Sequence, residues 1–165
     1  MFDFVYLNKS QKDEYLPLLF DLLYANMSLI APSNSSYETE RSEFLTEVSS
    51  ALEKEPRKII LCYCKGELAG FLMYYTRDAL VMIEELQLKK QYQNTMLFFR
   101  LCSFLAAELP ESIEQIESFV HKENLYSLSL QTSLGMRIIG TENSELHHLC
   151  GDAKMIRNRF NKRGV

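Results

Sequence analysis

Two adjacent carboxylates, Glu84 and Glu85, are the candidates for a general base in this sequence of 165 residues. They stand in an apolar run that is typical of a β-strand, so they are expected to point to opposite faces of it. Glu84 shares its face with Leu86 and Leu88, and Glu85 shares its face with Gln87. A partly buried carboxylate has a raised pKa, which suits a general base near neutral pH. The alternative is a pair of charges at a strand end that face solvent.

The cysteine and histidine residues are weaker candidates for chemistry. Cys62 and Cys64 place two thiols on one strand face, which is not the spacing of a zinc knuckle, and no second pair follows. We therefore expect these cysteines to pack in the core, and we predict no metal site. His147 and His148 are neighbours on a strand and point to opposite faces, so at most one of them would contact a polar substrate.

The period of the apolar side chains predicts the strands and helices on which these residues lie. Strands are expected at residues 2–7, 58–64, 68–76, 80–88, 113–120, 136–140 and 146–150. Helices are expected from about residue 14 to 30, from residue 36 or 37 to 52, from residue 96 to just before Pro110, and at 124–134. The resulting order is β-α-α-β-β-β-α-β-α-β-β.

This order predicts an α+β fold with helices on both faces of a mixed, largely antiparallel central sheet. The three strands between residues 58 and 88 have short connections and form an antiparallel meander. The strand, helix and strand between residues 80 and 120 require a right-handed crossover, which makes the two strands parallel. We expect residues 1–151 to form a single domain. The basic tail, residues 152–165, is either a frayed helix or a disordered end.

Composition and charge argue against several classes of protein. The net charge of −4 disfavours general nucleic-acid binding, which usually requires a basic domain. No apolar run approaches the roughly 18–20 residues of a membrane span, and residues 1–8 lack the pattern of a secretory signal. Four cysteines are too few and too scattered for a disulfide framework. We therefore expect a cytoplasmic protein with no membrane or nucleic-acid partner.

Residues 84–101, EELQLKKQYQNTMLFFRL, resemble the acyl-CoA-binding motif of the GNAT acetyltransferase superfamily. In that family the central strand leads into a loop of the form Arg/Gln-x-x-Gly-x-Gly/Ala, and this loop opens a helix. The residues that correspond to the loop are Gln93, Asn94, Thr95, Met96, Leu97 and Phe98. The meander upstream and residues 120–124 and 135–136 downstream also match the order of elements in the family. The resemblance thus implies a GNAT-like acyl-CoA-binding domain over residues 1–151.

The resemblance implies acetyl-CoA as the cofactor that donates the acyl group. Backbone N–H groups at the start of the helix, together with the helix dipole, would bind the pyrophosphate of CoA. Backbone groups of Leu86, Gln87 and Leu88 would pair with the pantetheine arm like an added strand. Asn124, from the family's strand–Asn–helix ending, is expected to contact the cofactor as well.

The resemblance also implies roles for the two carboxylates and for residues that contact the acceptor. One carboxylate, with Glu84 as the first choice and Glu85 as the second, would deprotonate a primary amine that attacks the thioester directly. The acceptor, a small molecule or a peptide, would be contacted by Asn26, Met27, Tyr74 and Tyr75. One of the two tyrosines should face the acceptor and the other the core.

Three residues depart from the pattern of the family. Met96 and Phe98 replace both glycines of the loop, where a missing Cβ lets the backbone approach a phosphate. Gln131 stands where the family often has a tyrosine as general acid, and an amide cannot protonate a thiolate. The carboxylates favour an N-acetyltransferase, whereas these three residues favour a non-catalytic CoA-binding or protein-interaction module. A homodimer is compatible with either, because sheet edges in small domains often pair.

Overall fold

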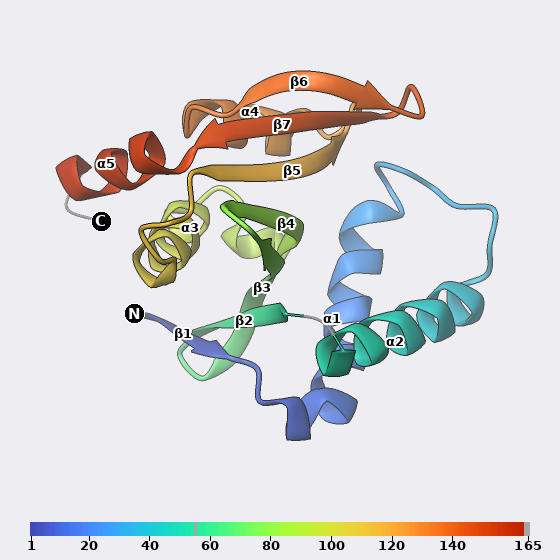
Figure 1. Ribbon diagram of the computed structural model, residues 1–165. Helices are drawn as coiled ribbons and strands as arrows, with labels where there is room; N and C mark the ends of the chain where they lie inside the picture. Colours follow the sequence, from blue (N-terminus) through green and yellow to red (C-terminus); the bar gives the residue numbers. More distant parts are fainter. Residues whose placement is uncertain (55, 164–165) are drawn as a thin grey trace. The chain divides into compact units, whose positions relative to one another are not determined.

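The computed structural model describes residues 1–54 and 56–163, and these residues form seven strands and five α-helices (Figure 1). In chain order the elements are β1 (Phe2–Tyr6), α1 (Lys12–Met27), α2 (Tyr37–Lys54), β2 (Arg57–Cys64), β3 (Glu67–Arg77), β4 (Leu80–Leu88), α3 (Leu97–Glu108), β5 (Gln115–His121), α4 (Leu125–Ser133), β6 (Arg137–Glu142), β7 (Leu146–Asp152) and α5 (Ala153–Arg163). The strand order in the sheet is β1-β2-β3-β4-β5-β7-β6. The predicted α+β fold and order of elements are confirmed, with α5 added at the end.

The chain divides into two compact units, and β4 contributes to both of them. The first unit comprises Met1–Tyr75 and Glu85–Thr95, and the second comprises Thr76–Glu84 and the chain from Met96 on. The boundary within β4 therefore falls between the two carboxylates that the sequence singles out.

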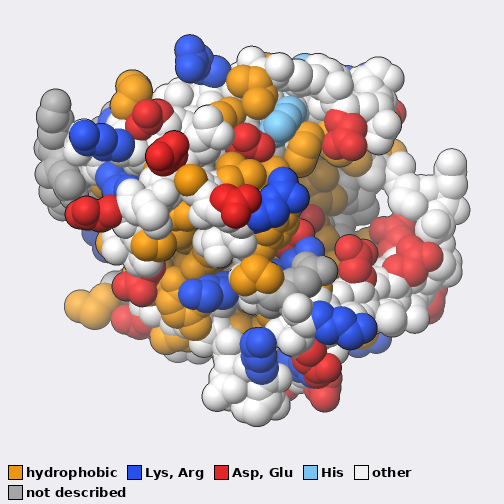
Figure 2. Space-filling model, viewed as in Figure 1, with side chains coloured by type: hydrophobic (Ala, Val, Ile, Leu, Met, Phe, Trp, Pro, Cys, Tyr) orange, Lys and Arg blue, Asp and Glu red, His pale blue; other side chains and the backbone are white. Residues whose placement is uncertain are grey.

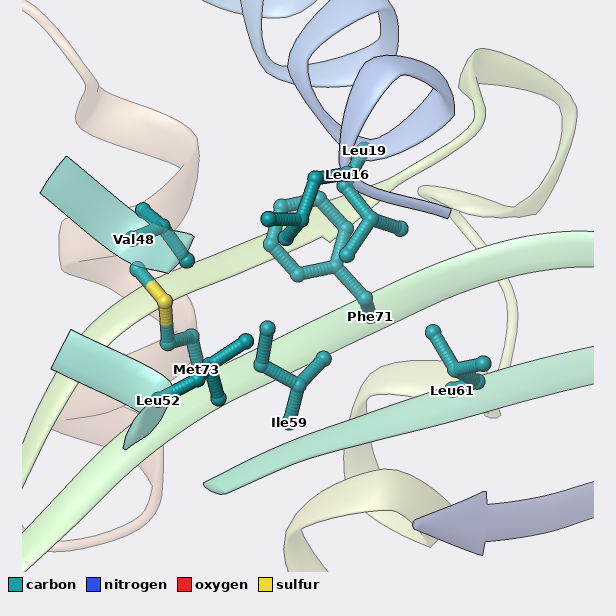
Figure 3. Packing of buried hydrophobic residues seen from close by; sticks show 8 residues of the cluster. All are labelled: Leu16, Leu19, Val48, Leu52, Ile59, Leu61, Phe71 and Met73. Atoms are coloured by element: carbon teal, nitrogen blue, oxygen red, sulfur yellow. The ribbon is translucent and has the colours of Figure 1, made fainter. Parts of the chain in front are cut away.

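In the first unit, α1 and α2 pack on β2 and β3 through one apolar cluster (Figure 3). The strands contribute alternate residues that pair in register, Ile59 with Met73 and Leu61 with Phe71. The helices contribute residues three or four positions apart, namely Leu16, Leu19, Val48 and Leu52. The apolar faces of the strands and of the helices thus pack together in one buried layer.

None of the helices in the described part of the chain is both long enough and apolar enough to cross a membrane.

The β2–β3 hairpin brings β3 back along β2 and sets its register. Cys64 pairs with Glu67, so Lys65 and Gly66 alone form the loop. Their φ angles are 52° and 82°, as in the two-residue turns whose twist matches the flanking strands. The short connection predicted between these two strands is confirmed.

In the second unit, the first half of β4 pairs with β5 in parallel, from Leu80 and Gln115 to Ile83 and Ser118. This is the pairing that the crossover through α3 requires. β7 pairs antiparallel with both β5 and β6.

The C-terminal segment is helical as far as residue 163. Ala153, Ile156 and Phe160 follow helical spacing and are buried. Arg157 donates hydrogen bonds of 3.3, 3.3 and 2.7 Å to the carbonyl oxygens of Ala106, Leu109 and Pro110. These carbonyls lie at and just beyond the end of α3, where a helix leaves its acceptors unpaired. Of the two alternatives for this tail, the structure shows the helix.

Candidate active site

A chain of side-chain amides connects Glu85 to helix α1 in the first unit. Glu85 and Gln87 lie on one face of β4, and Gln87 Nε2 donates to Glu85 Oε2 at 2.9 Å. Asn26 Nδ2, from the last turn of α1, donates to Gln87 Oε1 at 3.0 Å. The Gln87 side chain is only 8% exposed, and its amide makes one bond as donor and one as acceptor. These bonds hold the Glu85 carboxylate in a defined orientation.

The same amides hold the last carbonyl of β4. Lys89 donates its N–H to Ala69 O at 2.9 Å, so the Leu88 carbonyl, on the opposite side of the trans peptide, points away from β3. This oxygen accepts hydrogen bonds from Asn26 Nδ2 at 3.0 Å and from Gln93 Nε2 at 3.2 Å. Gln93 also donates to Asn26 Oδ1 at 3.2 Å. The end of β4 is therefore fixed by two amide side chains.

A glycine on β3 lets the two strands approach closely at this level. A Cβ atom on Gly70 would lie 2.6 Å from the carbonyl oxygen of Gln87 and 2.6 Å from Leu88 Cδ2. No side chain larger than hydrogen fits without a shift of β4. Gly70 thus contributes to the position of the residues that carry the amide network.

Five of the predicted site residues therefore come together, namely Asn26, Glu85, Gln87, Leu88 and Gln93. The strand period predicted the shared face of Glu85 and Gln87, although Gln87 was expected to contribute only backbone groups. The bonds from Asn26 could not be predicted, because Asn26 and Gln87 are 61 residues apart in the sequence. The roles assigned to these residues toward cofactor and acceptor stay predictions.

The loop that follows β4 contains three of the predicted cofactor contacts, Gln93, Asn94 and Thr95. It opens with a 3₁₀ turn, Lys90–Tyr92. The backbone N–H and the hydroxyl of Thr95 both donate to the Tyr92 carbonyl, at 3.2 and 2.7 Å. Asn94 and Thr95 are exposed, whereas the Gln93 side chain turns to the Leu88 carbonyl. The loop is short, internally bonded and open to solvent.

In the second unit, the residues that replace the two motif glycines leave the start of α3 regular. Met96 precedes the helix with φ −69° and ψ 0°, which any residue can adopt, and it is 51% exposed. Leu97 and Phe98 are buried, and the Phe98 ring packs edge to face on the Phe99 ring with centroids 5.2 Å apart. Neither replacement requires a positive φ, and the Phe98 side chain is directed inward. The helix start is therefore compatible with a bound phosphate despite both substitutions.

Glu84 belongs to the second unit and is partly buried. Met82, two residues earlier and thus on the same strand face, pairs with Glu117 of β5. The face of β4 that carries Glu84 therefore continues into the face of β5 that carries Glu117 and Phe119.

Polar residues of α4 bond to one another and to β5. Asn124 caps the helix, and its Oδ1 atom accepts from the Ser127 N–H at 3.1 Å. Gln131 Oε1 accepts from the buried Ser118 hydroxyl, and Gln131 Nε2 donates to Ser127 Oγ at 3.2 Å. Gln131 thus links α4 to β5 by a hydrogen bond, at the position where the GNAT superfamily often has a tyrosine as general acid. The predicted contact of Asn124 with the cofactor stays a prediction.

Two neighbouring residues of α1, both predicted to contact the acceptor, have different surroundings. Asn26 belongs to the amide network. Met27 lines a cavity of about 260 Å³ whose wall also includes Phe20, Tyr24 and Glu40. The cavity is formed by the end of α1, the loop after it and the start of α2.

The two adjacent tyrosines of β3, Tyr74 and Tyr75, also differ in burial. Tyr74 is 2% exposed, and its hydroxyl lies 3.1 Å from the Tyr6 hydroxyl of β1. Tyr75 is partly buried. Tyr74 is thus the buried member of the pair, and Tyr75 is the one that remains a candidate for the acceptor.

The histidine pair divides between the two faces of β7. His148 Nε2 lies 2.7 Å from Glu117 Oε2, and the His148 ring stacks on Phe119 with centroids 4.5 Å apart. His147 Nδ1 lies 3.4 Å from Thr141 Oγ1. The sequence predicted that the two histidines point to opposite faces, but it did not predict the contacts of His148 with Glu117 and Phe119.

The buried thiols have little nucleophilic character. Burial raises the pKa of the Cys62 thiol and the pKa of the Cys102 thiol to about 12 each. Since the thiolate is the reactive form, neither residue is a nucleophile near neutral pH.

Comparison with solved structures finds this architecture among acetyltransferases. A crystal structure of an acetyltransferase from Thermus thermophilus matches with a TM-score of 0.74 and 15% identity, over 92% of this chain and 97% of that chain. PaiA N-acetyltransferase from Thermoplasma acidophilum, in complex with coenzyme A, matches with a TM-score of 0.71 and 16% identity, over 92% and 99%. Aminoglycoside acetyltransferase AAC(6')-Ib, also in complex with coenzyme A, matches with a TM-score of 0.68 and 14% identity, over 100% of both chains.

No family model matches the sequence, and comparison with the curated proteins finds no match. At identities this low, the likeness establishes the fold alone. The chain has the fold of the GNAT acetyltransferases, as the resemblance of residues 84–101 implied.

Proposed function

We propose that this chain is an N-acetyltransferase that uses acetyl-CoA and transfers the acetyl group to a primary amine by direct attack. The observation that carries the proposal is the end of β4, where amide side chains join the Glu85 carboxylate, the outward Leu88 carbonyl and the loop residue Gln93. The coenzyme A bound to two proteins of the same fold supports this type of cofactor. The name of the aminoglycoside acetyltransferase supports an amine acceptor.

The residues at this end of β4 fit acetyl-CoA, which supplies an activated acetyl thioester when bound. Leu88 directs its carbonyl away from β3, and alternation gives Leu86 the same direction. The Leu88 carbonyl already accepts from Asn26 and Gln93, so the backbone groups of Leu86 are the ones that would pair with an extended ligand. Asn94, Thr95 and the first N–H groups of α3 would hold the pyrophosphate. The regular backbone at Met96 and the inward Phe98 side chain allow this.

The chemical work of the protein is to place the amine and to take its proton. Glu84 or Glu85 accepts that proton while the bond from nitrogen to the carbonyl carbon forms and the C–S bond breaks. Holding both reactants in one site supplies much of the rate. Gln131 has no acidic proton and is bonded to Ser118 and Ser127, so it does not protonate the departing thiolate, and we propose water as the source of that proton.

A second candidate function is a CoA-binding module without turnover. The bonds of Gln131 to Ser118 and Ser127 favour this module, because a hydrogen-bonded amide then occupies the position where a general acid would be needed. The two functions differ in turnover and share the binding of the cofactor.

Calorimetric titration with acetyl-CoA, followed by an amine screen for thiol release, tests the proposal. We expect micromolar binding by the wild type and similar affinity in Glu84→Gln and Glu85→Gln, because an amide conserves the shape of each side chain. At least one of these variants should lose about 10²- to 10⁴-fold in kcat, since no side chain then accepts the proton of the amine.

Three outcomes would count against parts of the proposal. If acetyl-CoA fails to bind at millimolar concentration, the cofactor and the enzyme are both wrong. If both variants keep the wild-type kcat, neither carboxylate is the base. If the cofactor binds and no amine releases thiol, the module is the better function.

A further inference from the structure

We infer that one face of β4, β5 and β7 in the second unit recognises the acceptor, and that Phe119 selects amines that carry an aromatic ring. The inference rests on the proposed function for the identity of the ligand, which is the amine that receives the acetyl group. It goes beyond that function by naming the class of amine and a residue that determines specificity.

Strand register places Glu84 and Phe119 on the same face of the sheet, because each lies two residues after the paired residues Met82 and Glu117. β4 and β5 pair in parallel up to Ile83 and Ser118, and the next residue along each strand is Glu84 and Phe119 respectively. Phe119 is in turn the register partner of His148 on β7. Register partners on neighbouring strands point to the same face, with strands about 5 Å apart. A phenyl ring and an imidazole therefore lie side by side, and a carboxylate lies on the same face just beyond the last paired residues of β4 and β5.

The phenyl ring of Phe119 is covered by His148 on one side and remains partly exposed. The rings of Phe119 and His148 stack with an interplanar angle of 22°, so His148 covers the side of the phenyl ring that faces β7. The bond of His148 Nε2 to Glu117 Oε2 at 2.7 Å fixes the imidazole. Phe119 is 38% exposed, whereas Ser118 on the opposite face is 2% exposed, so part of the phenyl ring stays accessible to a ligand.

Histidine and hydrophobic side chains lie together on the surface of the second unit (Figure 2). Figure 2 shows histidine side chains exposed beside hydrophobic ones in the part of the view where Figure 1 draws β5 to β7. A ligand ring can stack on the exposed part of Phe119, next to His148. Its amine would then lie on the face of the sheet that carries Glu84.

The charges of this face favour a monoamine over a polyamine. The carboxylate of Glu117 is already bonded to His148. Arg137 of β6 is level with Cys150 of β7 and adds a positive charge to the same face. A ligand with several ammonium groups would meet this positive charge and too few carboxylates. The arrangement fits a primary amine joined by a short alkyl chain to an aromatic ring, because ring stacking adds to the burial of apolar area.

Calorimetry with two matched amines tests the inference without requiring turnover. The probes are 2-phenylethylamine and 2-cyclohexylethylamine, which have equal charge and similar size, and only the first has a flat aromatic ring. Each is titrated into the protein with and without saturating CoA. We expect Phe119→Ala to weaken the binding of 2-phenylethylamine about three- to tenfold and that of 2-cyclohexylethylamine less than twofold.

Two further variants serve as controls. Phe119→Tyr keeps the ring and should bind both amines like the wild type. Ile138→Ala removes a side chain that is 49% exposed on the opposite face, level with Leu149, and should also leave both affinities unchanged. If Phe119→Ala does not fold, Phe119→Leu removes the ring and keeps apolar volume.

The inference is overturned if the loss of the ring weakens both amines by the same factor or leaves both unchanged. It is equally overturned if the wild type binds spermidine more tightly than 2-phenylethylamine, or fails to bind 2-phenylethylamine at millimolar concentration. A failure of the proposed function has a different signature, which is the absence of acetyl-CoA binding or of thiol release.

Discussion

Amide side chains are the residues best suited to the network at the end of β4, because an amide donates and accepts at the same time. Gln87 donates to the Glu85 carboxylate and accepts from Asn26, and Gln93 donates to both Asn26 and the Leu88 carbonyl. A lysine in place of Gln87 could not accept, and a glutamate could not donate. The neutral amides therefore orient a carboxylate without adding a charge beside it.

At the residue scale, Gly70 is expected to be intolerant of substitution. Gly70→Ala places a methyl group 2.6 Å from the Gln87 carbonyl oxygen, so β4 must shift. We expect the free energy of unfolding to fall by about 1–3 kcal/mol, the usual effect of overpacking, as measured by urea denaturation. Gly140→Ala is the matched control, because nothing lies within 4 Å of a Cβ there. Equal stability of the two variants would contradict the close approach of β3 and β4.

At the scale of elements, α5 completes the second unit. Its residue Ile156 packs beside Gly151 of β7, where an added Cβ would lie 2.8 Å from Ile156 Cδ1. Arg157, the next residue, binds three carbonyl oxygens at the end of α3. The helix thus packs on β7 and is hydrogen-bonded to the end of α3. The basic composition of residues 152–165 did not predict these contacts.

The removal of the Ile156 side chain should therefore destabilise the protein. Ile156 is 4% exposed, and we expect Ile156→Ala to lower the free energy of unfolding by about 2–4 kcal/mol, because it leaves a cavity. Lys154→Ala on the exposed side of the same helix should change it by less than about 0.5 kcal/mol. Urea denaturation measures both. A frayed tail would instead give two variants as stable as the wild type.

At the scale of the whole molecule, one strand belongs to both compact units. β4 contributes Leu80 to Glu84 to the second unit and Glu85 to Leu88 to the first. Because the two units share β4, the unfolding of either unit disrupts a strand that the other unit also contains. We therefore expect the two units to unfold in a single transition.

The buried thiols provide one probe in each unit for this expectation. Cys62 lies in the first unit and Cys102 in the second, and burial raises the pKa of each thiol to about 12. At pH 8 both are therefore protonated and unreactive in the folded state, whereas unfolding returns the pKa to about 8.5 and exposes the thiolate. Iodoacetamide pulses at increasing urea, read by mass spectrometry, should label both at the same urea midpoint. Two separate midpoints would show that the units unfold independently.

Local spacing in the sequence was sufficient for the order of elements and for several features of the site. The change of period from two to 3.6 located strands and helices, and the spacing of the apolar runs predicted the short connection that Lys65 and Gly66 form. The shared face of Glu85 and Gln87 followed from strand alternation. These features depend on residues a few positions apart, so the chain encodes them directly.

Tertiary structure alone decided which distant residues meet. Asn26 bonds to Gln87 across 61 residues, and Gln131 bonds to Ser118 on a different element. The directions of Met96 and Phe98 depend on where α3 begins, which the resemblance to a glycine-rich loop did not specify. No spacing rule reports such contacts, because they arise when packing brings separate helices and strands together. The fold was therefore predictable from the sequence, and the bonds that orient the candidate site were not.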